Sequence, residues 1–237
     1  MRTAALAGVV GLFLTTAGAA RADLVTGAEQ LTRGDYKAAI AELGRTKGAD
    51  GGKARLLLVE AQRAVGDLKG AEATATAATK DADPVVATSA KVALGEVQAA
   101  TGRLAEAQRT LEAVVKADPG HRRARRALAE VLTTVGKVAD ATALWKRTID
   151  EYDAKVLDLD KPDDLFALAE AARSTGEFEL ANTAYQEAVN LQPTFTEAGV
   201  AWAALFLSKY SGELAEQTYD ETLKINPTHP DAHAGMA

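Results

Sequence analysis

Residues 162–193, PDDLFALAEAARSTGEFELANTAYQEAVNLQP, predict two helices joined by one turn. In the first half, four apolar residues recur on one face of a helix, namely Leu165, Leu168, Ala169 and Ala172. Gly176 ends this helix, because glycine adopts the left-handed backbone conformation at little cost. The second half carries its own apolar face, formed by Ala181, Tyr185 and Ala188.

The same pattern recurs along the chain. Five glycines each end an apolar-periodic segment: Gly34, Gly66, Gly102, Gly136 and Gly176. Five residues after each glycine stands an alanine: Ala39, Ala71, Ala107, Ala141 and Ala181. Four residues further on, the position is large or apolar in nearly every copy: Leu43, Ala75, Leu111, Trp145 and Tyr185. The glycines are 32, 36, 34 and 40 residues apart, so the sequence predicts a repeated helix–turn–helix segment.

A period near 34 residues, with small and bulky residues at fixed offsets and Pro119, Pro193 and Pro227 at the ends of repeats, resembles the tetratricopeptide repeat (TPR). The resemblance covers almost all of the chain after residue 22. It implies an all-α fold, a right-handed superhelical solenoid of antiparallel helix pairs, with about six repeats plus the start of a seventh. The expected repeats are 23–52, 53–86, 87–120, 121–153, 162–195 and 196–229, with a partial one at 230–237.

Helices approach each other closely only where side chains are small, so Ala107, Ala141 and Ala181 are expected at the helix crossings. Ala184 is expected to lie off that face. In the sixth repeat Tyr210 occupies the expected turn position and Gly212 follows two residues later, so we expect a shifted turn there.

Three segments depart from the period. The glycine-rich residues 44–52 predict a loose connection before a helix over residues 53–65. The acidic segment 150–164 is expected to be an insertion that serves as a hinge or an extra partner contact. The third segment is a run of arginines, Arg122, Arg123, Arg125 and Arg126. It is interpreted either as a solvated face, with Arg126 paired to Glu130, or as an anion-binding patch.

Residues 1–22 differ from the rest of the chain. Arg2 precedes an uncharged run rich in Ala, Val, Leu and Gly, and Ala20-Arg21-Ala22 has the small-x-small pattern of a signal-peptide cleavage site. The alternative is an uncleaved membrane anchor, for which the run is short. We expect cleavage after Ala22, export to the periplasm or the outside of the cell, and no stable membrane insertion afterwards.

Composition excludes several classes of function. The chain has no cysteine, so it can form neither a disulfide nor a thiolate metal site. The formal charge of −6 becomes about −8 without Arg2 and Arg21, which argues against nucleic acid as a partner. His229 and His233 have the spacing of a metal pair, but Pro230 and the missing glutamate argue against one. Phosphate-binding and nucleophile motifs are missing too, so we expect no enzyme, no cofactor and no metal.

One pattern goes beyond architecture. Four glutamates lie six residues before a turn glycine: Glu60, Glu96, Glu130 and Glu170. The residues one turn earlier are Leu56, Val92, Arg126 and Phe166, and Val200 extends this row. The resemblance implies that the first helices line a concave groove and that these nine residues contact a partner there. The alternative is intrahelical pairing, because Arg63, Arg126 and Arg173 lie three or four residues from a glutamate of the row.

The resemblance also excludes one kind of partner. Family members that clamp the acidic tails of chaperones resemble one another in having Asn where this row has Glu, and a free carboxylate would be repelled here. A basic or amphipathic segment, either a helix or an extended peptide, is the expected ligand.

Two functions of different class stay open. The first is a protein–protein interaction scaffold of the bacterial cell envelope, which binds partner segments in the repeat groove. The second is the non-catalytic front part of a longer exported enzyme, a hydrolase or peptidase, with its active site beyond Ala237. The reading frame after Ala237 would distinguish them.

The apolar run and the Ala20-Arg21-Ala22 pattern predict that the mature protein begins at Asp23 outside the cytoplasm. Mass spectrometry of the native protein after cell fractionation measures this. A protein with Met1 intact in the cytoplasmic fraction would contradict the prediction.

Overall fold

The computed structural model describes residues 23–209 and 211–237, and all regular secondary structure in these residues is helical. The predicted signal peptide lies outside the described residues. Contacts between residues divide the described part of the chain into two compact units, residues 23–31 with Asp35–Ala90 and Thr32–Gly34 with the residues from Lys91 onward.

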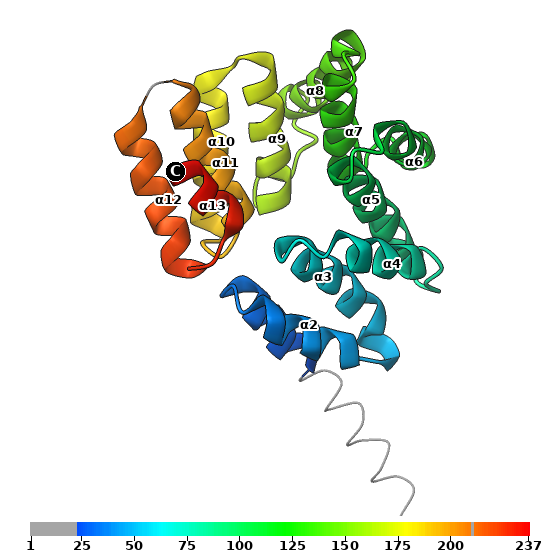
Figure 1. Cartoon of the computed structure of the whole chain (residues 1–237). Coiled ribbons are helices and arrows are strands. Elements are labelled where there is room, and N and C mark those ends of the chain that lie inside the picture. The colour runs from blue at the N-terminus through cyan, green and yellow to red at the C-terminus, as the bar shows by residue number, and fades with distance from the viewer. Residues whose placement is uncertain (1–22, 210) are drawn as a thin grey trace, which may run out of the picture. The chain divides into compact units, whose positions relative to one another are not determined.

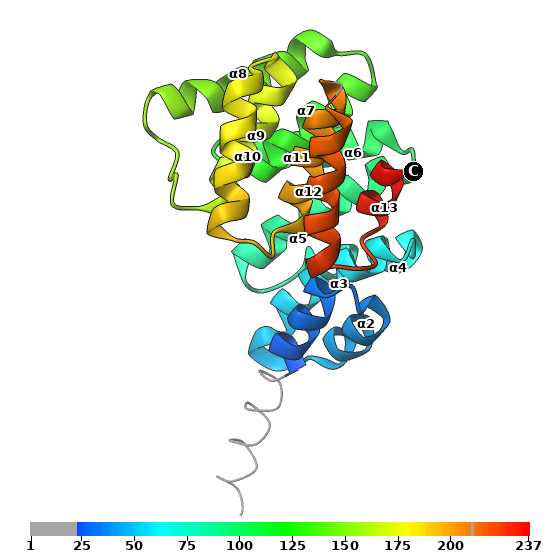
Figure 2. The same ribbon diagram turned by 90° about the vertical axis from the view of Figure 1, so that its left-hand side faces the viewer.

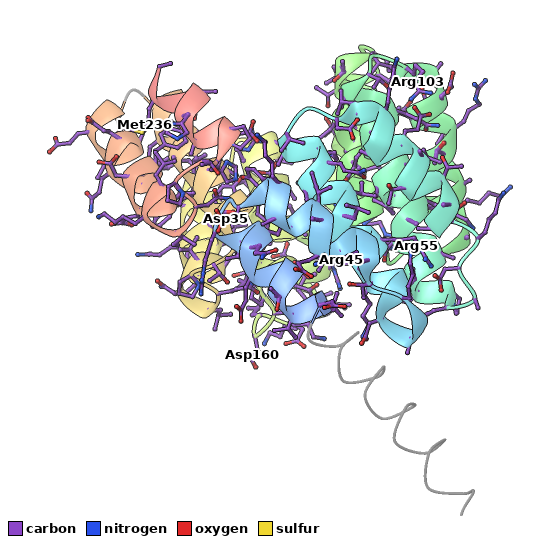
Figure 3. The ribbon with its side chains drawn as sticks, turned by 60° about the horizontal axis from the view of Figure 1, so that its bottom comes forward. Asp35, Arg45, Arg55, Arg103, Asp160 and Met236 are labelled. Atoms are coloured by element: carbon purple, nitrogen blue, oxygen red, sulfur yellow. The ribbon has the colours of Figure 1, made fainter. Side chains whose placement is uncertain are left out.

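The first compact unit consists of short helices joined by tight turns (Figure 1). Residues 23–32 are helical, and α2 (Tyr36–Arg45), α3 (Gly51–Ala64), α4 (Leu68–Ala78) and the start of α5 (Pro84–Ala100) follow. The predicted loose connection over residues 44–52 is wrong in part, because it holds the end of α2, the 3-10 helix Gly48–Asp50 and the first turn of α3. The side chain of Arg55 on α3 (Figure 3) pairs with Asp81, which follows α4.

The second compact unit continues the series of helix pairs. After α5 come α6 (Leu104–Ala117), α7 (Arg122–Thr134), α8 (Val138–Asp153), α9 (Pro162–Thr175), α10 (Phe178–Leu191), α11 (Thr196–Ser208), α12 (Gly212–Ile225) and α13 (Pro230–Met236). The helices α9, α10, α11 and α12 run alongside one another, as Figures 1 and 2 both show. The predicted all-α fold of helix pairs is therefore confirmed.

The five predicted turn glycines all adopt the left-handed conformation, with φ between 76° and 87°. In each of these turns the residue after the glycine donates its backbone N–H to a carbonyl five residues earlier, as Glu177 does to Ala172 at 2.8 Å. Ser211 donates to Phe206 in the same way at 3.0 Å. The sixth turn is therefore in register with the other five, and the predicted shift is wrong.

The predicted crossing alanines are buried completely, and the sixth repeat adds an equivalent one. Each of these six residues is at most 1% exposed: Ala39, Ala71, Ala107, Ala141, Ala181 and Ala215. Ala184, which we expected off this face, is 3% exposed and belongs to the same core cluster as Ala181. That expectation is wrong because α10 is covered on two sides, by α9 and by α11.

Glycines also lie inside helices, where the sequence pattern had assigned them no role. A Cβ added to Gly95 on α5 would lie 2.6 Å from Cγ of Leu111 on α6. Gly27 faces Leu43 in the same way, also at 2.6 Å. In these two pairs the first helix supplies the small residue at a position where the second helix carries a leucine.

The arginine run at the start of α7 is not an anion-binding patch, because carboxylates of this chain bind all four side chains. The expected pair between Arg126 and Glu130 is present at 3.8 Å, but a solvated face is wrong for Arg125. Arg125 is 1% exposed, and its Nη2 lies 2.6 Å from Glu151 on α8. Arg122 lies 3.0 Å from Asp164 on α9 and 3.5 Å from Glu151. The hydrogen bonds from Arg125 hold the pKa of Glu151 below its usual value.

These pairs also correct the expectation for segment 150–164. Its first residues complete α8, which ends at Asp153, and its last residues begin α9 at Pro162. Only residues 154–161 connect the two helices, and Asp160 in this connection is exposed (Figure 3). Glu151 and Asp164 flank this connection, and both bind arginines of α7. The two ends of the connection are therefore held against α7.

Ala107→Leu is expected to destabilise the protein by about 1–3 kcal/mol, because the larger side chain overpacks the contact between α6 and its neighbours. Ala113→Leu on the same helix is the matched control. Ala113 is exposed, and both variants make the same alanine-to-leucine change, so the change in helix propensity is the same. Urea unfolding followed by circular dichroism measures both variants. Equal unfolding midpoints would show that Ala107 does not lie at a helix crossing.

Arg125→Ala is expected to cost about 3–5 kcal/mol, because it removes a completely buried side chain and the closest hydrogen bonds of Glu151, which keeps only the longer contacts to Arg122 and Arg147. Arg147→Ala removes a more exposed arginine that lies 3.5 Å from the same carboxylate, and it should cost only about 0–1 kcal/mol. The unfolding free energies of the two variants give the comparison. A loss for Arg125→Ala no larger than that for Arg147→Ala would contradict the role assigned to this ion pair.

Candidate functional site

Three glutamates of the predicted row come together around one arginine. Arg126 on α7 is surrounded by carboxylates from four helices, and we call these five residues the Arg126 cluster: Glu96 on α5, Arg126 and Glu130 on α7, Glu170 on α9 and Glu197 on α11. The repeat period explains the row, because equivalent positions of successive first helices point in the same direction. All members belong to the second compact unit.

Arg126 makes its shortest contact with the most distant member of the cluster. Its Nη1 lies 2.9 Å from Glu197, which is 71 residues away in sequence, and the same nitrogen lies 3.8 Å from Glu130. Its Nη2 lies 4.0 Å from Glu96. The guanidinium carbon also lies 4.9 Å from the centroid of the Phe166 ring. Although burial disfavours its charge, Glu197 and Glu130 raise the pKa of Arg126 above its usual value.

Glu130 has a carboxyl group whose pKa is raised above its usual value. Burial among the helices raises the pKa of Glu130 to about 7, Arg126 opposes this effect, and the carboxylates of Glu170, Glu96 and Glu197 add to it. The Glu130 side chain is 50% exposed, so solvent screening reduces the size of the pKa shift but not its direction. Glu130 is therefore a carboxyl group that changes charge closer to neutral pH than an ordinary glutamate.

Glu170 is buried, and this chain's own residues bind both of its oxygens. Arg173 donates to one oxygen at 2.7 Å, and the Tyr185 hydroxyl donates to the other. Arg173 also donates to the Tyr185 oxygen at 3.2 Å. Burial and the charge of Glu170 raise the pKa of Tyr185 above its usual value, so this hydroxyl keeps its proton. The alternative of intrahelical pairing is therefore confirmed for Glu170 and Arg173.

Glu96 is bound by an arginine of the next repeat. Arg123 on α7 contacts both of its oxygens, at 3.0 and 2.9 Å, in the bidentate geometry that arginine and carboxylate favour. Glu130 and Glu197 differ from Glu96 and Glu170, because they share Arg126 and are 50% and 56% exposed. The surface that a partner can reach in this cluster is thus formed by Glu130 and Glu197.

The apolar part of the predicted groove is corrected by the structure. Val92 is completely buried and Phe166 is 5% exposed, so neither can line an open groove. They lie one turn before the row, where the first helix faces its neighbours, and both belong to core clusters. Val200 on α11 is half-buried. Leu56 and Glu60 on α3 are also half-buried, and they belong to the first compact unit.

Glu197 was not among the predicted site residues. The prediction used only the position six residues before each turn, which is Ala204 in the sixth repeat, and Glu197 lies seven residues earlier. A spacing of seven places two residues on the same helical face, so this periodicity was the signal that could have revealed Glu197.

The histidines bind the backbone near their own positions. The Nδ1 atom of His229 accepts from the N–H of Ala232 at 3.4 Å, and Nε2 of His233 lies 2.8 Å from the carbonyl of Pro227. Within residues 23–209 and 211–237, no group of three or more His, Asp or Glu side chains has the arrangement of a metal site. In the same residues, no helix is long and apolar enough to cross a membrane.

Comparisons with solved structures show the same fold. A chain of the Cut9–Hcn1 hetero-tetramer of the APC/C has 16% identity and a TM-score of 0.53, over 95% of this chain and 45% of that one. This chain thus spans less than half of that relative. TTC0263, a thermophilic TPR protein in Thermus thermophilus, has 22% identity and a TM-score of 0.53, over 80% of this chain and 100% of that one.

Comparisons with sequences agree on the repeat. Among curated proteins, no sequence matches this chain. Two family models described as tetratricopeptide repeat match residues 92–156 and 165–195. These segments contain α6 to α8 and α9 with α10, which carry most of the Arg126 cluster. The repeat pattern, the helix pairs and these matches together identify tetratricopeptide repeats within residues 92–156 and 165–195.

Proposed function

We propose that this protein is an interaction scaffold that binds a basic segment of a partner protein on the first-helix face of α7 and α11. The TPR fold supports the general part of this proposal, because TPR proteins bind protein or peptide partners. The observation that carries the specific part is that Glu130 and Glu197 are both about half exposed and share one guanidinium.

The charge of the cluster favours a cation. Arg123 neutralises Glu96, Arg173 neutralises Glu170, and Arg126 is left for both Glu130 and Glu197. One negative charge is thus unbalanced when Glu130 is ionised. A lysine or arginine of a partner would supply the missing charge, whereas an acidic peptide would be repelled. The bound segment is not expected to insert apolar side chains between the helices, because Val92 and Phe166 are already buried there.

We further propose that the scaffold works in the bacterial cell envelope after export. This part rests on the sequence of residues 1–22, with its uncharged apolar run and its Ala20-Arg21-Ala22 pattern. In that setting a scaffold without cysteines does not depend on the redox state of the compartment.

Selection from a displayed peptide library tests the binding proposal. Peptides that bind the protein should be enriched in Lys and Arg, and their affinity should fall as NaCl screens charges over about 8–10 Å. In the double variant Glu130→Gln with Glu197→Gln, affinity for a selected peptide should fall roughly two- to thirty-fold, because two exposed ion pairs are lost. Isothermal titration calorimetry measures the affinity.

The matched control is the double variant Glu187→Gln with Glu216→Gln. It removes the same charge from exposed positions on the second helices α10 and α12. If both double variants lose affinity equally, only net charge matters and the proposed site is wrong. Selected peptides with no enrichment in basic residues would contradict the proposal as well.

A further inference from the structure

The contact between Arg126 and Glu197 joins first helices that are not adjacent in the chain of repeats. Arg126 lies in the first turns of α7 and Glu197 in the first turn of α11, and α9 is the first helix between them. The link passes over α9, because the Phe166 ring lies beneath the guanidinium at 4.9 Å. Phe166 in turn packs edge-on against Phe195, directly before α11, with ring centroids 5.1 Å apart.

We propose that the ion pair between Arg126 and Glu197 is a clasp that holds the α7–α8 and α11–α12 pairs together across α9, and that ionisation of Glu130 opens it. The clasp is a property of the unbound chain. It therefore goes beyond the proposed binding of a basic segment and does not require it.

The opening follows from competition for one nitrogen. The Nη1 atom of Arg126 contacts Glu197 at 2.9 Å and Glu130 at 3.8 Å. While Glu130 is protonated, Arg126 has one charged partner at this nitrogen and the clasp is closed. When Glu130 ionises, it attracts the same nitrogen from the neighbouring turn of α7 and repels the carboxylate of Glu197. The pair within α7 then forms at the expense of the pair between α7 and α11.

Burial and the nearby carboxylates move this ionisation toward neutral pH, since they raise the pKa of Glu130 toward about 7. An ordinary glutamate, with a pKa of about 4.3, would stay ionised at every pH at which the protein is expected to work. Glu130 would then compete for Arg126 at all of these pH values, and the clasp would always be open. Because its environment raises the pKa of Glu130, the clasp has a closed state with Glu130 protonated and an open state with Glu130 ionised.

Other charged groups face the clasp from each helix packed around it. Glu96 on α5 is bound by Arg123, and Glu170 on α9 is bound by Arg173 and by Tyr185. The Tyr185 hydroxyl stays neutral, because its pKa is raised. Two histidines are also close enough to contribute: His121, at the start of α7, whose charge is influenced by Glu96, and His229, whose charge is influenced by Glu197. Burial lowers the pKa of both histidines. A substitution at Glu130 separates its effect from theirs.

The chain has no cysteine, so two spin labels can be placed on an otherwise unmodified protein. Ala143 on α8 and Asp220 on α12 are exposed and lie on the second helices, away from the Arg126 cluster. Both are replaced by cysteine and labelled, and the distance between the labels is measured by double electron–electron resonance at pH 6 and pH 8.5.

The expected result is a short, narrow distance distribution at pH 6 and a longer, broader one at pH 8.5. Glu130→Gln should keep the short distribution at both pH values, and Glu197→Gln should give the long one at both. Glu187→Gln on α10 is the control and should behave like the unsubstituted protein. A distribution that does not change with pH would overturn the proposal. A pH response that persists in Glu130→Gln would assign the response to the histidines and overturn it too.

Stability provides a second measurement that does not depend on the labels. The folded-state pKa of Glu130 lies above its unfolded value, so the folded state favours the protonated form. Stability from this group is therefore present below about pH 4.3 and is lost as the pH rises to about 7. Glu130→Gln should raise the unfolding midpoint in urea at pH 8.5 more than at pH 6. An equal change at both pH values would contradict the titration assigned to Glu130.

Discussion

The close approach of the two helices in each repeat is the constraint on which the other contacts depend. Six alanines at equivalent positions are almost completely inaccessible, and each is followed four residues later by a buried residue on the same face, as Ala181 is by Tyr185. A short helix pair buries too little apolar surface to be stable alone, so each pair must also pack on the next. Small residues at the crossing bring the helices close enough for one core to extend through several pairs. The glycine at position 95 serves the same purpose from the other helix, since Leu111 fills the space that its missing side chain leaves.

Polar contacts then fix helices within one pair and between pairs, and they do so in two physically different ways. Arg125 is buried against Glu151, so the loss of Glu151 would leave the charge of Arg125 without compensation in the interior. Arg126 contacts carboxylates that water can reach, and such pairs contribute little stability but respond to salt and pH. Two arginines adjacent in sequence therefore have different functions. One fixes α8 against α7, and the other can change partners.

The repeats could be predicted well from the sequence, because the positions that define their period accept few residue types. A glycine with φ near 80° at the end of a helix, and an alanine at a crossing, are each required by backbone geometry or by space.

The Arg126 cluster was predicted only in part from the sequence. Periodicity placed Glu96, Glu130 and Glu170 in one row, but it does not reveal what covers each residue. Phe166 and Glu170 were expected to face a ligand, and neighbouring helices bury both of them. The arginine run could not be interpreted for a similar reason, because its partner Glu151 is 26 residues away from Arg125 and Glu197 is 71 residues away from Arg126.

A row of like charges is a direct consequence of repetition, and it has an energetic cost. When each repeat places a carboxylate at the same point, neighbouring charges repel, and burial between helices increases that repulsion. The chain offsets most of this repulsion with arginines supplied from different places: Arg123 from the next repeat for Glu96, and Arg173 from the same helix for Glu170. For Glu130 and Glu197 it supplies one arginine for two carboxylates. A complete set of counterions would make the row a purely structural feature, with each carboxylate permanently paired. Because one arginine is missing, a proton or a cation from outside the chain can complete the charge balance at Glu130 and Glu197. In this way the architecture of the repeat leads to a function.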